Sequence, residues 1–246
     1  MFRFYLMALL SGPIVLWTRW MHKIYKKHPN HFSEKRLYRM SCWVMNGMRM
    51  RALTWTKAYG TENLPEHGGY ILYSNHQGKY DALGIFLKHK KTCRVLMEKK
   101  QSEKVLANEV VDFLQGQRLD FEDPRQQLMV LKAIGEEVKD GKRYLIFPEG
   151  GYTDNKNTLQ EFHSGCFRPA YDAKCPIIPV CIVDSYKSMN SNTLEPVHTQ
   201  VHYLAPIPYE EYKDLKKTEL AELVKARIQA KMDEVLNARK TPKKGK

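Results

Sequence analysis

The sequence contains few cysteines, and they are not arranged as a metal site or a disulfide framework. There are five, an odd number, and no two of them form a Cys-x-x-Cys pair. Histidine and cysteine nowhere cluster at the spacing that zinc ligands need. We therefore expect reduced thiols that mostly fill the core, in a cytosolic compartment, and no structural metal.

A long hydrophobic run is also lacking. The uncharged run from Phe4 to Trp17 has 14 residues, whereas a helix that crosses a membrane at right angles needs about 20. No small-residue cleavage site follows it, and cations such as Arg19 and Lys23 follow the run instead of preceding it, unlike in a secretory signal. Aromatic and basic residues after an apolar helix favour an anchor that lies in or dips into an anionic membrane surface. A buried core helix is the alternative.

Acidic residues are in deficit, and the serine-hydrolase signature is absent. Against 40 Lys and Arg there are 27 Asp and Glu, a net charge of +13, which indicates an anionic partner: nucleic acid, an acidic membrane, or a substrate that carries phosphate or CoA. Nucleic acid is disfavoured, because the cations are densest near the apolar N-terminus and in the tail and are not interleaved with stacking aromatics. Since no Gly-x-Ser-x-Gly occurs, the stretch Phe162-His163-Ser164-Gly165 is given no catalytic role.

The order of apolar and helical patterns predicts an α/β fold with a mainly parallel or mixed sheet flanked by helices, because strand and helix patterns alternate from about Lys57 onward. Expected strands are Tyr70–Ser74, Arg94–Met97, Tyr144–Phe147, Ile177–Val183 and Val201–Leu204. Expected helices are Phe32–Thr56, Asp81–Lys88, Ser102–Leu114, Pro124–Lys139, Gly165–Lys174 and Thr218–Arg239. We divide the chain into a hydrophobic and basic helical anchor (1–56), an α/β domain (57–238) and a basic, solvated tail (239–246) that is able to contact anionic lipid.

The segment Ser74–Asp81 follows the expected strand Tyr70–Ser74 and carries a histidine and an aspartate five places apart. The carboxyl end of a strand is the usual place for a ligand site in an α/β sheet. If Asp81 opens the next helix, its carboxylate can accept a hydrogen bond from the imidazole of His76 and leave the other ring nitrogen free to take a proton. Asn75 supplies an amide to steady the turn or a substrate. Turn residues with an ordinary helix cap are the structural alternative.

Two further stretches have the same form of a buried strand that runs into a special turn. Glu149 follows the strand Tyr144–Phe147, and Gly150 and Gly151 allow a ligand to approach the backbone closely. An exposed loop acid is the alternative there. The Pro-punctuated strand that begins at Cys175-Pro176 can equally be simple core.

The order of these blocks resembles that of the glycerolipid acyltransferase family, and most closely the bacterial 1-acyl-glycerol-3-phosphate acyltransferases of the PlsC type. The blocks are Asn75-His76-x4-Asp81, the basic segment that ends at Asp123-Pro124-Arg125, Phe147-Pro148-Glu149-Gly150, and Cys175-Pro176-Ile177-Ile178-Pro179-Val180. The resemblance extends over roughly residues 64–183. The order of the blocks is specific, although any one of them is not.

The resemblance implies an enzyme that moves a fatty acyl group from acyl-CoA or acyl-carrier protein to a lipid hydroxyl, with no cofactor beyond that co-substrate. His76 would be the general base and Asp81 would orient it, so that no acyl-enzyme forms. Glu149 and Gly150 match the block associated with the glycerol-phosphate acceptor, and Pro176 to Val180 match the apolar block near the acyl chain. The implied product is phosphatidic acid, and the implied place is the cytoplasmic face of a membrane.

The chain departs from the family pattern where arginines are usual. Phe121 stands after Asp120, and Tyr152 stands after Gly151, at positions that normally carry an arginine. We take Lys79, Arg118 and Arg125 as substitute phosphate ligands, because a bidentate guanidinium tolerates some change of origin; ordinary surface charges are the alternative for the two arginines. The missing arginines leave open a related glycerolipid as acceptor, and an acyl-thioesterase that activates water is a second class of function.

Overall fold

The structure is a computed structural model that describes residues 9–190 and 193–240. It contains a seven-stranded sheet of order β1-β7-β6-β2-β5-β3-β4. The strands are β1 (Thr54–Tyr59), β2 (Tyr70–Ser74), β3 (Arg94–Glu98), β4 (Gln117–Leu119), β5 (Arg143–Ile146), β6 (Ile177–Val183) and β7 (Val197–Tyr203). All neighbours are parallel except β6 and β7, which confirms the predicted α/β class and mainly parallel sheet.

The helices agree with the sequence prediction where the apolar periodicity is long. The structure has α2 (Gly12–Lys27), α3 (Glu34–Arg51), α4 (Asp81–Phe86), α5 (Lys99–Ser102), α6 (Ala107–Phe113), α7 (Pro124–Lys139), α8 (Arg168–Ala173), α9 (Lys187–Asn190), α10 (Tyr209–Tyr212) and α11 (Lys217–Lys240). Helix α7 has the predicted bounds, with Pro124 in its first turn and Asp123 as its N-cap.

Two edge strands were not predicted, and three predicted helices were too long: Phe32–Thr56, Ser102–Leu114, which is divided between α5 and α6, and Gly165–Lys174, of which α8 is the second part. Helix α3 ends at Arg51, and after Leu53, which has a positive φ of 45°, the chain enters β1. The expected helix Phe32–Thr56 was therefore wrong at its C-terminal end, because Thr54 and its neighbours pair with β7. Strand β4 has only three residues and pairs with β3 alone, so its sequence carries too short a pattern to detect.

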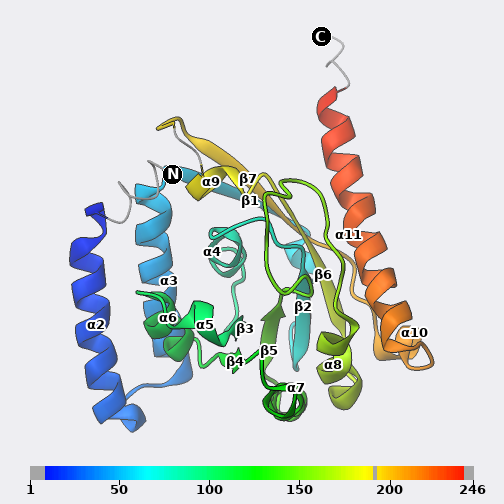
Figure 1. Cartoon of the computed structure of the whole chain (residues 1–246), viewed down its shortest axis with the longest axis horizontal. Coiled ribbons are helices and arrows are strands. Elements are labelled where there is room, and N and C mark those ends of the chain that lie inside the picture. Colours follow the sequence, from blue (N-terminus) through cyan, green and yellow to red (C-terminus); the bar gives the residue numbers. More distant parts are fainter. Residues whose placement is uncertain (1–8, 191–192, 241–246) are drawn as a thin grey trace.

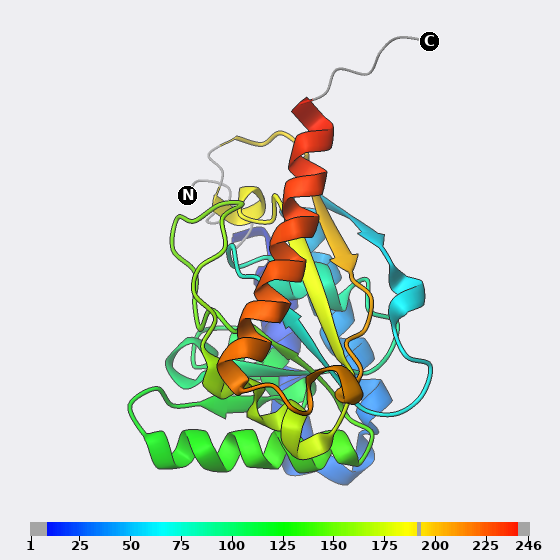
Figure 2. The ribbon, with the colours of Figure 1, turned by 90° about the vertical axis from the view of Figure 1, so that its right-hand side faces the viewer.

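The two faces of the sheet are covered by different helices, as Figures 1 and 2 show. Strand β2 is buried on both sides: Ile71 and Tyr73 belong to one apolar cluster, and Tyr70 and Leu72 belong to another. The first cluster includes residues of α7, α8 and α11, and the second includes residues of α3, α4 and α6. Helix α11 lies diagonally over β6 in Figure 2.

Helix α2 lies at one end of the molecule beside α3 (Figure 1). Its Ile14 packs against Val44 of α3, while Leu16 and Trp20 are exposed. Among the described residues, no helix combines the length and the apolar content that crossing a membrane requires. The first eight residues of the expected anchor, and residues 241–246 of the expected tail, lie outside the described part of the chain.

Candidate active site

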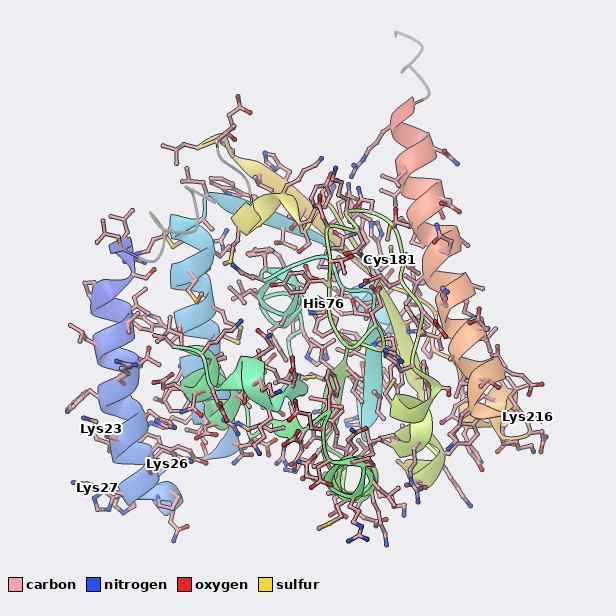
Figure 3. The ribbon with its side chains drawn as sticks, viewed as in Figure 1. Lys23, Lys26, Lys27, His76, Cys181 and Lys216 are labelled. Carbon is pink, nitrogen blue, oxygen red and sulfur yellow. The ribbon has the colours of Figure 1, made fainter. Side chains whose placement is uncertain are left out.

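Three strand ends bring the candidate site residues to one edge of the sheet. Strands β6, β2 and β5 are adjacent and parallel, so their carboxyl ends meet at the same edge. His76 follows β2, Glu149 follows β5, and Asp184 follows β6. Figure 3 shows His76 near the centre of the molecule, between the N-terminal helices and α11.

The histidine and the aspartate form a close pair. Nδ1 of His76 lies 2.6 Å from Oδ2 of Asp81, and the Asp81 side chain is fully buried whereas 18% of the His76 side chain is exposed. With Nδ1–H donating to the carboxylate, Nε2 is the nitrogen left to accept a proton, and it has no hydrogen-bond partner among the described residues. The structure thus contains the contact between imidazole and carboxylate that the sequence predicted.

Asp81 also closes the turn that precedes α4. Its Oδ2 accepts from the backbone N–H of Gln77 and of Gly78, at 2.5 and 2.8 Å, and Asp81 is the first residue of the helix as predicted. Asp81 is not an ordinary helix cap, because Tyr80 occupies the cap position and no side chain caps this helix. Its carboxylate closes the turn and at the same time contacts His76. One oxygen receives three donors, which fixes the position of the charge beside His76.

Glu149 is bound to the same segment. It is buried, its Oε1 accepts from the backbone N–H of His76 at 3.0 Å, and its Oε2 accepts from Nε2 of Gln160 at 2.7 Å. Burial raises the pKa of Glu149, although these hydrogen bonds oppose the rise. The alternative of an exposed loop acid was thus wrong.

The glycine after Glu149 is required by the local backbone. Gly150 has a φ of +69°, and a Cβ there would lie 3.2 Å from Cδ2 of His163 and 3.7 Å from Cζ of Phe121. A side chain at this position is therefore disfavoured by both backbone and space. A Cβ on Gly151 would meet no described atom within 4 Å.

Aromatic rings surround the imidazole. Phe147 stacks on His76 with centroids 4.3 Å apart, and Tyr152 meets its edge at 4.7 Å. Of the two residues that stand where the resemblance implies an arginine, Tyr152 therefore contacts the imidazole, whereas Phe121 lies beside Gly150. Burial, with the charge of Asp81, raises the pKa of Tyr152, which keeps this phenol neutral at physiological pH.

The three candidate phosphate ligands have different surroundings. Arg118, in β4, donates to Ser102, Asn108 and Asp112, and its Nη2 lies 2.7 Å from Oδ1 of Asp112. Arg125, in the first turn of α7, is exposed and its guanidinium makes no hydrogen bond or ion pair with any described residue. Lys79, three residues after His76 in the sequence, is exposed, and partial desolvation with repulsion from Lys104 lowers its pKa.

Asn75 has a structural partner. Its Nδ2 donates to the carbonyl oxygen of Ile182 at 3.1 Å, and its Oδ1 accepts from the backbone N–H of Ile182 at 2.8 Å. The side chain therefore extends the pairing of β2 with β6 by one residue. This contact positions His76 and supports the first of the two predicted roles for Asn75, which is to steady the turn.

The sequence did not point to the amide side chains that hold the loop between β5 and α8. Nδ2 of Asn155 donates to the carbonyl oxygen of His76, and Oδ1 of Asn157 accepts from Nε2 of the buried Gln77. Neither contact follows from residue spacing, because the partners are about 80 positions apart. The only signal was the number of polar amides directly after the glycine turn.

None of the five cysteines makes a hydrogen bond with His76, Asp81 or Glu149 in the described part of the chain. All five are free, and burial raises the pKa of every thiol, for example that of Cys181 to about 12. A buried neutral thiol is a poor nucleophile. Among the described residues, no group of three or more His, Cys, Asp and Glu side chains has a metal-binding arrangement.

Comparison with known proteins agrees with the geometry. The model of the Acyltransferase family matches residues 56–183, just over half of the chain. The chain belongs to the Acyltransferase family. The match includes His76, Asp81 and Glu149 and ends at Val183, one residue before Asp184.

Similar proteins carry one activity in their names. A 1-acyl-sn-glycerol-3-phosphate acyltransferase of Salmonella typhimurium is 33% identical over 90 residues, which are 37% of this chain and 36% of that protein. A putative 1-acyl-sn-glycerol-3-phosphate acyltransferase of Caenorhabditis elegans is 28% identical over 172 residues, 68% of this chain and 61% of that protein. The alignment thus spans only about a third of the Salmonella relative.

The fold is shared with a solved member of this family. The crystal structure of the acyltransferase PlsC from Thermotoga maritima superposes with a TM-score of 0.71, over 95% of this chain and 93% of that one. Sequence identity is 18%. The likeness therefore extends to the N-terminal helices and α11, which lie outside the family model.

Proposed function

We propose that this acyltransferase moves a fatty acyl group from an acyl thioester to the free hydroxyl of 1-acyl-glycerol-3-phosphate, which gives phosphatidic acid for phospholipid synthesis. The observation that carries the proposal is the contact of 2.6 Å between His76 Nδ1 and Asp81 Oδ2, which leaves Nε2 of the partly exposed ring without a hydrogen-bond partner among the described residues. The names of the similar proteins support the choice of acceptor.

The proposed reaction needs one base and no covalent intermediate on the enzyme. Nε2 of His76 takes the proton of the acceptor hydroxyl while that oxygen attacks the thioester carbonyl. The C–O bond forms, the C–S bond breaks, and the thiolate leaves with the proton returned by the imidazolium. The buried charge of Asp81 stabilises the imidazolium during the transfer.

We propose that Glu149, Gly150 and Gly151 form the side of the site that meets the acceptor. The Glu149 carboxylate holds the backbone of His76, and Gly150 keeps the turn open. For the phosphate we propose Lys79, Arg118 and Arg125. Of the two arginines, Arg125 is the better supported, because Arg118 already has three polar partners.

We also propose the place and the co-substrates of the enzyme. The donor is acyl-CoA or acyl-carrier protein, and no cofactor or metal takes part. Residues 1–56 form a membrane-associating segment that places the α/β domain (57–238) on an anionic cytoplasmic membrane surface. The exposed Leu16 and Trp20, next to Arg19 and Lys23, support this arrangement.

A panel of acceptors tests the reaction. Lysophosphatidate, glycerol 3-phosphate and other lysophospholipids would be offered with long-chain acyl-CoA and with acyl-carrier protein, to the unaltered enzyme and to His76→Ala. We expect transfer to lysophosphatidate, and no transfer by the variant at an unchanged unfolding midpoint. Full activity of His76→Ala would rule out the mechanism.

The same panel separates the phosphate ligands and the second candidate function. Arg125→Ala should raise the KM for lysophosphatidate with little change for an acceptor that lacks a phosphomonoester, and Arg118→Ala is the parallel variant. Consumption of acyl-CoA at the same rate without any acceptor would instead indicate a thioesterase, in which Nε2 of His76 activates water.

A further inference from the structure

A chain of polar contacts joins the C-terminal end of α11 to the catalytic segment, although these parts are more than 150 residues apart. It runs from Arg239 to Asp184, from Asp184 to Asn157, and from Asn157 to Gln77. Gln77 is the residue after His76. Asp184 and Arg239 lie outside the region that the family model matches.

Gln77 connects three segments at the buried end of this chain. Its Nε2 donates to Oδ1 of Asn157 at 2.9 Å and to the carbonyl oxygen of Ile182 at 3.1 Å, and its Oε1 accepts from the backbone N–H of Ser185 at 2.9 Å. Its own backbone N–H donates to Asp81. The position of Gln77 therefore sets the position of the carboxylate that holds His76.

Asp184 lies in the middle of this series of polar contacts, and its backbone has an unfavourable conformation. It is 5% exposed and has a φ of +63°, a left-handed conformation that asparagine and glycine adopt at least as readily as aspartate. Its Oδ1 accepts from Asn157 at 2.9 Å and from Lys187 at 3.0 Å, and its backbone N–H donates to Oδ1 of Asn157 at 2.9 Å. A charged carboxylate in such a position indicates that the charge itself is used.

Arg239 is the outermost residue of this series of polar contacts. Its Nη1 lies 2.6 Å from Oδ2 of Asp184, with 7% of the Asp184 side chain exposed. Although burial alone would raise it, the pKa of Asp184 is lowered by hydrogen bonds from Asn157, Lys187 and Arg239. The sequence predicted Arg239 as the last residue of a helix and the first residue of a solvated basic tail. It lies within α11, and its guanidinium is not free in solvent but reaches the turn after β6.

We propose that Asp184 and Arg239 are positioning residues, which act through Asn157 and Gln77 to hold the Asp81 carboxylate and the loop 150–163 in the arrangement that acyl transfer needs. The proposal rests on the proposed role of His76. The loop contacts His76 through Asn155 and Tyr152, so loss of the junction at Asp184 would loosen both sides of the imidazole. The end of α11 then controls turnover without touching the substrates.

Kinetics of single variants tests the proposal. We expect Arg239→Ala and Asp184→Asn to lower kcat about tenfold while the KM for donor and acceptor changes less than about twofold. Arg239→Lys should recover part of the loss, because an ammonium can pair with the carboxylate. The double variant should be no slower than Asp184→Asn alone, since both changes break one path.

Matched controls are present on the same helix. Arg227 pairs with Glu211, and its side chain is exposed to a similar extent as that of Arg239. No contact of the described residues connects this pair to Gln77, so Arg227→Ala should keep kcat unchanged. Truncation after Lys240 retains Arg239 and should be fully active, whereas truncation after Ala238 should reproduce Arg239→Ala. Urea midpoints identify any variant that is unfolded in the assay. If Asp184→Asn fails to fold, the comparison of kcat between the two truncations tests the proposal instead.

Each outcome has a defined meaning. If Arg239→Ala and the truncation after Ala238 have the kcat of Arg227→Ala, the proposal is wrong and the role of His76 is unaffected. A change confined to KM would also overturn it. If His76→Ala is fully active, the proposed function itself fails.

Discussion

The segment 75–81 and helix α2 are both attached to the body of the protein by polar contacts. The segment buries its polar side chains, whereas the helix exposes some of its large apolar side chains. In the segment, Asn75, Gln77 and Asp81 are each 1% exposed and hydrogen-bonded. In α2, Leu16 and Trp20 are 71% and 60% exposed. Hydrogen-bonded polar groups that are buried hold one geometry. Exposed apolar groups are suited to binding another surface, such as a membrane.

The ionic contacts of the two regions differ in the same way. The Asp81 carboxylate is enclosed and lies 2.6 Å from the imidazole of His76. Helix α2 is attached through Asp112 of α6, which His22 and Lys26 both approach to 2.7 Å, and through Glu109, which lies 3.5 Å from Arg19. More than half of the Arg19 and Lys26 side chains are exposed. Attachment by such pairs is weak and depends on salt and pH.

The largest effect is expected in the buried region, for Asp81→Asn. The amide oxygen can still accept from Gln77 and Gly78, so the fold should be kept, but the charge that stabilises the imidazolium is lost. We expect kcat to fall about a thousandfold. Steady-state kinetics measures this, with the urea midpoint as the check on folding. A loss of less than tenfold would mean that Asp81 serves the turn and not the chemistry.

A smaller effect is expected on α2, for the double variant Leu16→Glu and Trp20→Glu. Each exposed apolar side chain contributes about 1.5–3 kcal/mol when it is buried, so binding to anionic phospholipid vesicles should weaken at least tenfold with kcat on a soluble short-chain acceptor unchanged. Vesicle sedimentation measures the partition. Leu128→Glu, at a half-exposed site on α7, is the matched control, and equal losses in the two proteins would refute a role for α2.

Deletion of Met1–Trp17 should likewise shift the protein from the membrane to the soluble fraction, by a larger factor than the two substitutions because the whole apolar run is removed. Fractionation of expressing cells measures this shift. An unchanged partition would show that the N-terminal segment is not the anchor.

The smallest effect concerns the attachment of α2 by Asp112. Burial would raise the pKa of this carboxyl, but hydrogen bonds from Lys26, His22 and Arg118 lower it from 3.8 to about 2. Because the unfolded chain takes up the proton first, this stabilisation is fully present above about pH 4 and is lost as the pH falls through 2. Asp112→Asn should lower the free energy of unfolding by about 1 kcal/mol at pH 7, because solvent screening at the exposed partners reduces what the pKa shift alone implies.

Urea denaturation at several pH values checks this sign. The difference between Asp112→Asn and the unaltered protein should shrink as the pH falls from 4 toward 2. Glu122→Gln, which breaks an exposed pair with Lys100, should change stability by less than about 0.5 kcal/mol at every pH. A constant difference for Asp112→Asn would show that its charge contributes nothing.

Much of the fold could be predicted, because its strongest elements carry their pattern locally. Strands β2 and β6 and helix α7 have the predicted bounds, since each is a buried run or a capped amphipathic stretch. Strand β1 could not be predicted, because Thr54–Tyr59 is a strand only through its pairing with β7, about 143 residues away.

The sequence by itself determined the class of the protein and the pair His76 and Asp81, because the order of the blocks and the five-residue spacing are local properties. Only the tertiary structure decided that Glu149 holds the backbone of His76, that aromatic Tyr152 meets the imidazole, and that Asp184 and Arg239 reach Gln77. The physical reason is the parallel sheet. It brings the ends of β2, β5 and β6 to one edge, and contacts made there join residues whose separation along the chain carries no periodic signal.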